Sequence, residues 1–317
     1  LFYNEIFSDF PPLRNIAVKD HGFADLSMTW LEKGAWLGNS MLDRLYIDFG
    51  RGAWQIRAGR QRINWGLNLV SNPNDLFNTY SFFDFDYVER PGSDALRIQY
   101  HTGFASRLEF AFSPAADSKN STAAMLWAVN RGGYDLQLIT AYYRQRAAAG
   151  LGWAGNIGGA GFKGEATWFY DLEASGHKQR GNLVVATGID YIFSTGTFGV
   201  LEFLYNGGHE RQKKNSQHDD PIDQPLLITR PLQADNIMFS GYALTLHASH
   251  PFSSLLQGGL AVMWLPDIRS AFVMPNLKYS LAENFDMELV VQWFAGGSQS
   301  PFEQAGAGFF VAWQYSF

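Results

Sequence analysis

Two side chains stand at a spacing that could support nucleophilic catalysis, because His247 and Ser249 lie two positions apart. A histidine can activate a serine hydroxyl when the two groups are within hydrogen-bonding distance. The sequence contains no Gly-x-Ser-x-Gly, no phosphate-binding P-loop and no His-Glu-x-x-His motif, and it contains no cysteine that could act as a nucleophile or a zinc ligand. We therefore expect a protein that is not an enzyme and that carries no cofactor.

Charged side chains show a more regular pattern, because they alternate with apolar residues. Trp54, Ile56 and Ala58, for example, alternate with Gln55 and Arg57. Successive side chains of a β-strand point to opposite faces, so such a segment has one apolar face and one polar face. The charged residues that occupy polar faces in this way are Arg44, Arg57, Arg97, Arg107, Glu109, Lys163, Glu165, Glu202 and Glu288.

This period of two extends over about sixteen segments, and no helical period of useful length competes with it. Most of the segments approach the length of about 9–11 residues that a tilted β-strand needs to cross a bilayer. The predicted strands are 23–32, 42–49, 52–60, 95–102, 106–113, 122–130, 133–144, 147–156, 159–171, 181–193, 197–206, 238–249, 255–265, 270–281, 285–295 and 306–317.

The connections between these segments alternate in length. Turns such as 50–51 and 194–196 are short, whereas 61–94 and 207–237 are long. Short turns at one end and long loops at the other are typical of bacterial outer-membrane barrels, where the turns are periplasmic and the loops extracellular. The predicted fold is all-β: a closed antiparallel transmembrane β-barrel of about sixteen strands, with fourteen or eighteen also open.

The barrel is expected to span residues 23–317 as a single domain, and residues 1–22 are expected to form an N-terminal periplasmic segment that leads into it. A soluble β-sandwich would alternate too, but its polar faces would meet bulk water and carry many charges. Only 17% of this chain is charged, whereas 16% is aromatic. The net charge of −6 argues against nucleic acid as a partner.

The C-terminus resembles the terminal strand of Gram-negative outer-membrane proteins. That strand commonly ends on phenylalanine with aromatic residues at alternate positions, as Trp313, Tyr315 and Phe317 stand here. The resemblance implies a bacterial outer-membrane location and a strand that is read by the barrel-assembly machinery. A shorter resemblance covers about 20 residues: 59–66 (GRQRINWG) followed by 72–75 (NPND) is similar to a pattern of poorly characterised porin-like barrels, and it implies no particular solute.

The charged residues must face the lumen, because one Lys or Arg at mid-bilayer on the lipid face costs about 2–4 kcal/mol. The four arginines come from sequential strands and share one wall, whereas Glu165, Glu202 and Glu288 come from later strands. Two interpretations stay open. The two walls could face each other across water and impose a transverse field, or the charges could pair and tie the strands together.

The segment 61–94 is too long for a simple connection and too apolar for a solvated loop. We expect it to fold into the lumen and narrow it; the alternative is that it packs outside the barrel against a partner protein. Deleting residues 67–88 should then widen the pore. The residues expected at the constriction are Trp65, Asp75, Phe77, Asp84, Asp86 and Glu89.

The segment 207–237 differs, because its charged run 210–214 is typical of a solvated loop, and we expect it to be extracellular. His218, Asp219, Asp220 and Asp223 could ligate a divalent ion. Their spacing matches no known site, so we predict no metal.

These features together predict a porin-like channel for passive diffusion of small polar or charged solutes. The alternative is a non-conducting accessory barrel of a larger outer-membrane complex. The expected surroundings are membrane lipid, lipopolysaccharide and the barrel-assembly machinery. Other outer-membrane proteins, or further copies of the chain in a trimer, stay open as partners.

Overall fold

Almost all of the regular structure is β-strand. The computed structural model describes residues 2–3, 20, 22–33, 36–79, 92–173, 180–209, 233–297, 300 and 306–316. Two single 3₁₀ turns, η1 (Ser118–Asn120) and η2 (Pro266–Ile268), interrupt the connections. Among the described residues, no helix is long and apolar enough to cross a membrane.

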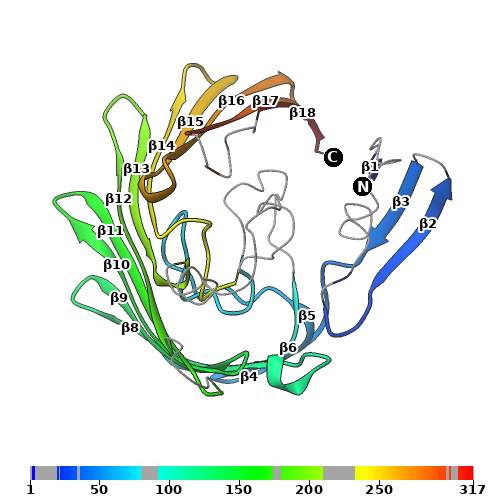
Figure 1. Ribbon diagram of the computed structural model, residues 1–317, viewed down its shortest axis with the longest axis vertical. Helices are drawn as coiled ribbons and strands as arrows, with labels where there is room; N and C mark the ends of the chain where they lie inside the picture. Colours follow the sequence, from blue (N-terminus) through cyan, green and yellow to red (C-terminus); the bar gives the residue numbers. More distant parts are fainter. Residues whose placement is uncertain are drawn as a thin grey trace.

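Fifteen strands form one antiparallel sheet in which every strand pairs with its neighbours in sequence. Figure 1 looks along the lumen and shows this sheet curving around a central space. The strands are β4 (Leu45–Arg51), β5 (Trp54–Gln61), β6 (Ser93–Gly103), β7 (Ser106–Ser113), β8 (Thr122–Arg131), β9 (Tyr134–Tyr143), β10 (Arg146–Ile157), β11 (Ala160–Asp171), β12 (Gly181–Ile192), β13 (Phe198–Asn206), β14 (Tyr242–Pro251), β15 (Leu256–Leu265), β16 (Ser270–Ala282), β17 (Phe285–Gly296) and β18 (Ala307–Tyr315). Each corresponds to one predicted segment.

A second, three-stranded sheet has the order β1 (Phe2–Tyr3), β3 (Trp36–Met41), β2 (Ser27–Lys33), and it is not hydrogen-bonded as a ladder to the described strands of the large sheet. The segment 33–41, which the predicted strands 23–32 and 42–49 leave as a connection, is therefore mostly strand β3. Alternation does not reveal this strand, since Gly38 contributes no side chain. A Cβ at Gly38 would lie 2.9 Å from the Cβ of Leu31 on β2, so only glycine permits this pairing.

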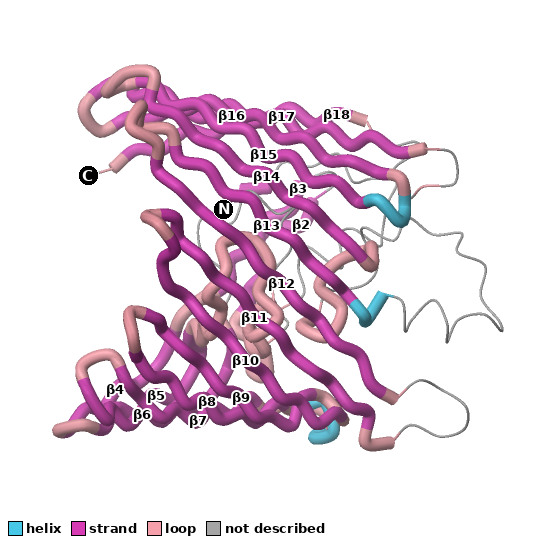
Figure 2. The backbone as a smooth tube through the Cα atoms, turned by 90° about the vertical axis from the view of Figure 1, so that its left-hand side faces the viewer, coloured by secondary structure: helices cyan, strands magenta, loops and turns pink. Residues whose placement is uncertain are grey.

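The connections differ in length at the two ends of the strands, as the sequence predicts. Tight turns join β4 to β5, β8 to β9 and β10 to β11 at one end, and longer connections lie at the other end, including 62–92 and 207–241 (Figure 2). Gly132 and Gly133 have φ of 63° and 79°, a conformation that two-residue hairpin turns require and that glycine adopts without strain.

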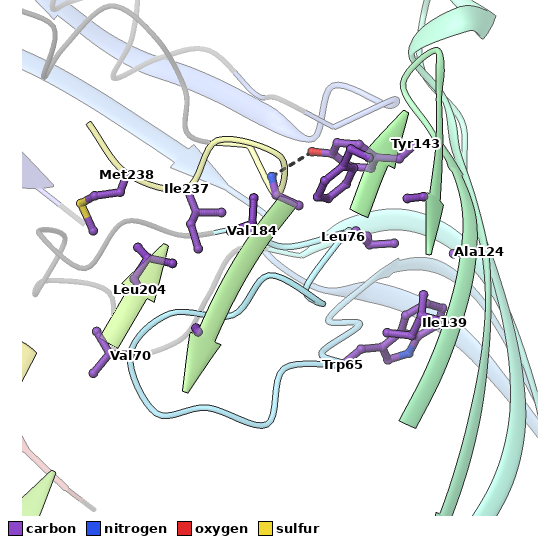
Figure 3. Packing of buried hydrophobic residues seen from close by; sticks show 14 of the residues in the cluster. Trp65, Val70, Leu76, Ala124, Ile139, Tyr143, Val184, Leu204, Ile237 and Met238 are labelled. Atoms are coloured by element: carbon purple, nitrogen blue, oxygen red, sulfur yellow. Dashed lines mark hydrogen bonds between the residues drawn. The ribbon is translucent and has the colours of Figure 1, made fainter. Parts of the chain in front are cut away.

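Alternation assigns the two faces of the sheet as the sequence predicts. Ile47 and Phe309 are 79% and 77% exposed on the outer face, where lipid would cover them. Glu165 and Leu126 are fully buried on the inner face. The buried residues are therefore not the core between two packed sheets. They are covered by parts of the chain that lie inside the curve of the sheet (Figures 1 and 3).

Candidate functional site

Residues 62–79, called the inward segment below, leave the end of β5 and lie inside the barrel (Figure 1). Trp65 of this segment is buried, and its indole Nε1 donates to Glu109 Oε1 on β7 at 2.7 Å. The ring of Phe77 contacts that of Trp65 edge to face, with centroids 5.3 Å apart. Asp75 is buried and accepts from the backbone N–H of Asn78 at 3.4 Å. Three of the residues expected at the constriction thus lie within the lumen.

Two buried glutamates of the barrel wall hold the backbone of the inward segment. Glu165 on β11 accepts from the backbone N–H groups of Leu67, Asn68 and Asn74, the last two at 2.8 and 2.9 Å. Buried backbone N–H groups need an acceptor, because leaving them unpaired costs free energy. The carboxylate supplies the acceptor that a strand ladder would otherwise provide.

Glu202 on β13 acts in the same way further along the segment. It accepts from the backbone N–H of Val70 at 3.1 Å and from that of Ser71 at 2.6 Å. In one of the two interpretations left open by the sequence, both glutamates face open water as an acidic wall. Both are buried beneath the inward segment instead.

Glycines on the inner face of β10 make room for the inward segment. Asn74 donates from Nδ2 to the carbonyl oxygen of Leu151 at 3.0 Å, and Thr167 donates to Asn74 Oδ1 at 2.7 Å. A Cβ at Gly150 would lie 2.7 Å from Asn74 Oδ1, and one at Gly152 would lie 3.0 Å from Asn74 Nδ2. Side chains at either position would push the segment away from the wall.

The GRQ motif has a structural explanation at the end of β5. Gly59 has φ of 121°, and a Cβ there would lie 2.3 Å from the carbonyl oxygen of Leu45. Gln61 donates from Nε2 to the carbonyl oxygen of Ala95 at 2.9 Å. Gln61 and Trp65 hold the start of the inward segment, and Asn74 holds it further along the chain.

Arg60 of this motif ties the N-terminal region to the main sheet. Its guanidinium donates to Asp20 at 2.7 Å, to Asp94 at 2.9 Å and to the carbonyl oxygen of Ala24 at 2.6 Å. Burial alone would raise the pKa of Asp20, but hydrogen bonds from Arg60 and from the backbone outweigh it and lower the pKa. Arg60 is not among the charged residues that the alternation of the sequence selects. Its place directly before the apolar inward segment was the available signal.

The predicted arginine wall on β4–β7 is built from close ion pairs. Arg97 and Arg107 both bind Glu109, at 2.6 and 3.0 Å, and Arg57 binds Asp48 on the neighbouring strand. The interpretation in which neighbouring charges pair therefore describes this wall.

The remaining charged residues of the predicted lumen also have partners nearby. Arg44 lies 3.4 Å from Asp43, and Lys163 lies 2.9 Å from Asp190. Glu288 accepts from Asn276 at 3.0 Å. Among the described residues, these contacts favour the interpretation in which the charges pair over the one in which two open walls impose a transverse field.

A second stretch of chain, residues 233–241, also lies inside the barrel. The backbone N–H of Ala234 donates to the hydroxyl of Tyr143 at 3.1 Å (dashed in Figure 3), and Arg146 pairs with Asp235. Asn206 donates to the carbonyl oxygen of Met238 at 2.7 Å. The expectation of a solvated loop over 207–237 therefore does not hold for its described end, because these polar and apolar groups find partners on the wall.

The two inward stretches share one apolar cluster with the wall. Val70 and Leu76 come from the first stretch and Ile237 and Met238 from the second, and Leu204 of β13 belongs to the same cluster (Figure 3). This part of the lumen is filled by protein.

Several predicted residues fall elsewhere. Trp313 and Tyr315 are exposed on the outer face of β18, and Asp84, Asp86, Glu89 and Phe317 lie outside the described residues. His250 follows Ser249, the serine considered above as a nucleophile, and its Nδ1 lies 2.8 Å from the hydroxyl of Thr197. His247 lies against the ring of Phe198. The candidate metal ligands 218–223 are also outside the described residues. In the part that is described, no group of three His, Asp or Glu side chains could hold a metal.

Comparison with known proteins identifies the architecture. No protein-family model matches the sequence, and no curated protein matches it. Among solved structures, the chain is similar to OccK10 (OpdN) of Pseudomonas aeruginosa, with a TM-score of 0.54 and 12% identity over 84% of this chain and 81% of that one.

Two further structures align with lower scores. OccK8 (OprE) of the same organism aligns at a TM-score of 0.49 with 8% identity, over 88% of this chain and 78% of that one. OccAB1 of Acinetobacter baumannii aligns at 0.47 with 10% identity, over 89% and 77%. Of these three alignments, the one with OccK10 supports an assignment of the fold. The chain has the fold of a transmembrane antiparallel β-barrel.

Proposed function

We propose that the protein is a porin-like channel of the bacterial outer membrane through which small polar or charged solutes diffuse passively. The observation that carries this proposal is the inward segment, which lies in the lumen on buried wall carboxylates. A barrel of this many strands is too wide for side chains alone to fill. A segment fixed across part of the lumen limits the size of the solutes that can pass.

The outer face supports the location. Large apolar side chains such as Ile47, Trp127 and Phe309 are exposed on it, and in water such a surface would associate. In an outer membrane it meets lipid. In this proposal the short turns are periplasmic, the long connections face lipopolysaccharide, and β18 is read during barrel assembly.

Planar-bilayer recording tests the proposal on protein that runs faster unheated than boiled on a detergent gel. Stable open conductance is expected. Deleting residues 67–88 should raise the single-channel conductance, because it removes the backbone groups that Glu165 and Glu202 hold. The matched control deletes exposed residues 116–119, which should leave conductance unchanged. Equal conductance in both deletions would place the constriction elsewhere.

One observation favours a second candidate, the non-conducting accessory barrel. The apolar cluster inside the lumen is closed to solvent, with Leu204 and Trp65 almost fully buried. A well-folded barrel that stays electrically silent would support this role and rule out the channel.

The arginine wall gives the channel proposal its own test. Replacing Arg57, Arg97 and Arg107 together with glutamine leaves Asp48 and Glu109 as the charges of this wall. The reversal potential in a salt gradient should move toward cation selectivity. A reversal potential that does not move would show that the permeation path does not follow this wall.

A further inference from the structure

One carboxylate lies at the centre of the charged wall. Five charged side chains face the lumen between β4 and β7, and two of them, Arg57 and Arg97, are direct partners in the register of β5 and β6. Like charges directly opposite each other destabilise a sheet. Asp48 is the register partner of Arg57 and neutralises that arginine. The other arginine requires a counter-ion from β7.

Glu109 provides that counter-ion and also binds three further groups. It accepts from Arg97 Nε at 2.6 Å and Arg97 Nη2 at 3.1 Å, a two-pronged arrangement that fixes the guanidinium. It also accepts from Arg107 at 3.0 Å, from Gln99 at 2.8 Å and from the indole of Trp65 at 2.7 Å. Every oxygen of this carboxylate is thus directed into the protein.

Glu109 is more deeply buried than its two arginine partners. Its side chain is 0% exposed, whereas those of Arg97 and Arg107 are 16% and 30% exposed. An ion in the lumen therefore meets the edges of the two guanidinium groups, and the negative charge lies behind them. Leaving aside Arg44 and its partner Asp43, three arginines stand against Asp48 and Glu109 in this group, so its formal charge is a single positive unit, and loss of Glu109 would double it.

We infer that Glu109 is the residue that sets the charge selectivity of this wall, and that it does so while holding the inward segment through Trp65. It is a positioning residue, because it acts on solutes through the arginines that it orients and neutralises. This inference rests on the proposed channel function. It predicts that wild-type Glu109 restrains the passage of anions, and that its removal favours them.

The test is Glu109→Gln, measured as the anion-to-cation permeability ratio from the reversal potential in a potassium chloride gradient. Glutamine has nearly the same shape, and its amide oxygen can still accept from Trp65, whereas its NH2 group no longer accepts from Arg97 and Arg107. The gel shift of the folded band checks that the variant folds. The permeability ratio should rise about twofold, which is what one unit charge about 8 Å away delivers between an anion and a cation once screening by about 0.1 M salt is included. The matched control is Glu173→Gln, which removes the same charge from an exposed ion pair with Lys119. Its permeability ratio should stay at the wild-type value.

The outcomes separate the two proposals. A conducting Glu109→Gln channel with the wild-type ratio overturns the role of Glu109 and leaves the channel standing, and so does an equal shift in both variants. A wild-type barrel that never conducts overturns both proposals. If Glu109→Gln does not fold, Arg107→Gln tests the same balance from the other side, because it leaves Glu109 with one arginine. That variant should lower the ratio about twofold, and an unchanged ratio contradicts the inference.

Discussion

The wall formed by β10–β13 and the wall formed by β4–β7 use the same residue types in opposite ways. On β11 and β13, Glu165 and Glu202 accept from backbone N–H groups of the inward segment and are covered by it. On β7, Glu109 accepts mainly from guanidinium groups that remain partly open to the lumen. The first wall is covered by protein and fixes the position of a segment, whereas the second remains charged.

The difference shows that alternation specifies which face a glutamate occupies but not what it binds. Small neighbours decide the outcome. Gly150 and Gly152 let the chain approach β10, whereas Glu109 on β7 is bound by Arg97 and Arg107 of its own wall. Where glycines leave room, a wall carboxylate binds the backbone N–H groups of the inward segment. Where arginines surround it, the carboxylate is their counter-ion.

The largest effect should follow from Glu165→Ala on the covered wall. The variant leaves the N–H groups of Leu67, Asn68 and Asn74 without their acceptor, at about 1–3 kcal/mol for each buried unpaired group. We expect a loss of about 4 kcal/mol in the free energy of unfolding, since part of the cost is relieved as the segment moves. Urea unfolding in lipid vesicles, followed by the gel shift of the folded band, measures this. Glu173→Ala, at an exposed ion pair with Lys119, is the control and should unfold like wild type.

A smaller effect is expected from Gly150→Val, which leaves every charge in place. The new side chain would collide with Asn74, and overpacking of this kind costs about 1–3 kcal/mol. Single-channel conductance should rise as well, because the inward segment is displaced. The control is Ala149→Val, whose side chain is exposed on the outer face one residue away. If both variants conduct alike, close approach of the segment to β10 is not what positions it.

The smallest effect is expected on the side of the molecule formed by β4–β7, where Arg60 at the end of β5 donates a hydrogen bond to Asp20. The pKa of Asp20 is lowered in the folded protein, so this contact stabilises the fold above the ordinary pKa of 3.8, and the stabilisation is lost as the pH falls below that value. Protease cleavage near the N-terminus should accelerate between roughly pH 5 and pH 3, measured with an acid-stable protease. Asp20→Asn should be cleaved fast at both pH values. Equal acceleration in the variant would assign the pH effect to other groups.

Much of the architecture could be predicted from single residues. The alternation of Leu45, Ile47 and Phe49 with polar neighbours predicts both a strand and its outward face, and the same reasoning locates each strand of the large sheet. It failed at Gly38, where the missing side chain interrupts the pattern. The site was harder to predict, because Arg60, Asn74 and Asp235 act through partners that are distant in sequence.

The sequence by itself determined a membrane barrel with charges facing inward, because the period of two is a local property and lipid does not accept charge. Only the tertiary structure decided which carboxylates hold backbone and which hold arginines. That choice depends on contacts such as Asn74 with Glu165, 91 positions apart, and on the space that glycines leave between them. No local pattern records such a contact, because it exists only after the sheet has curved around the inward segment.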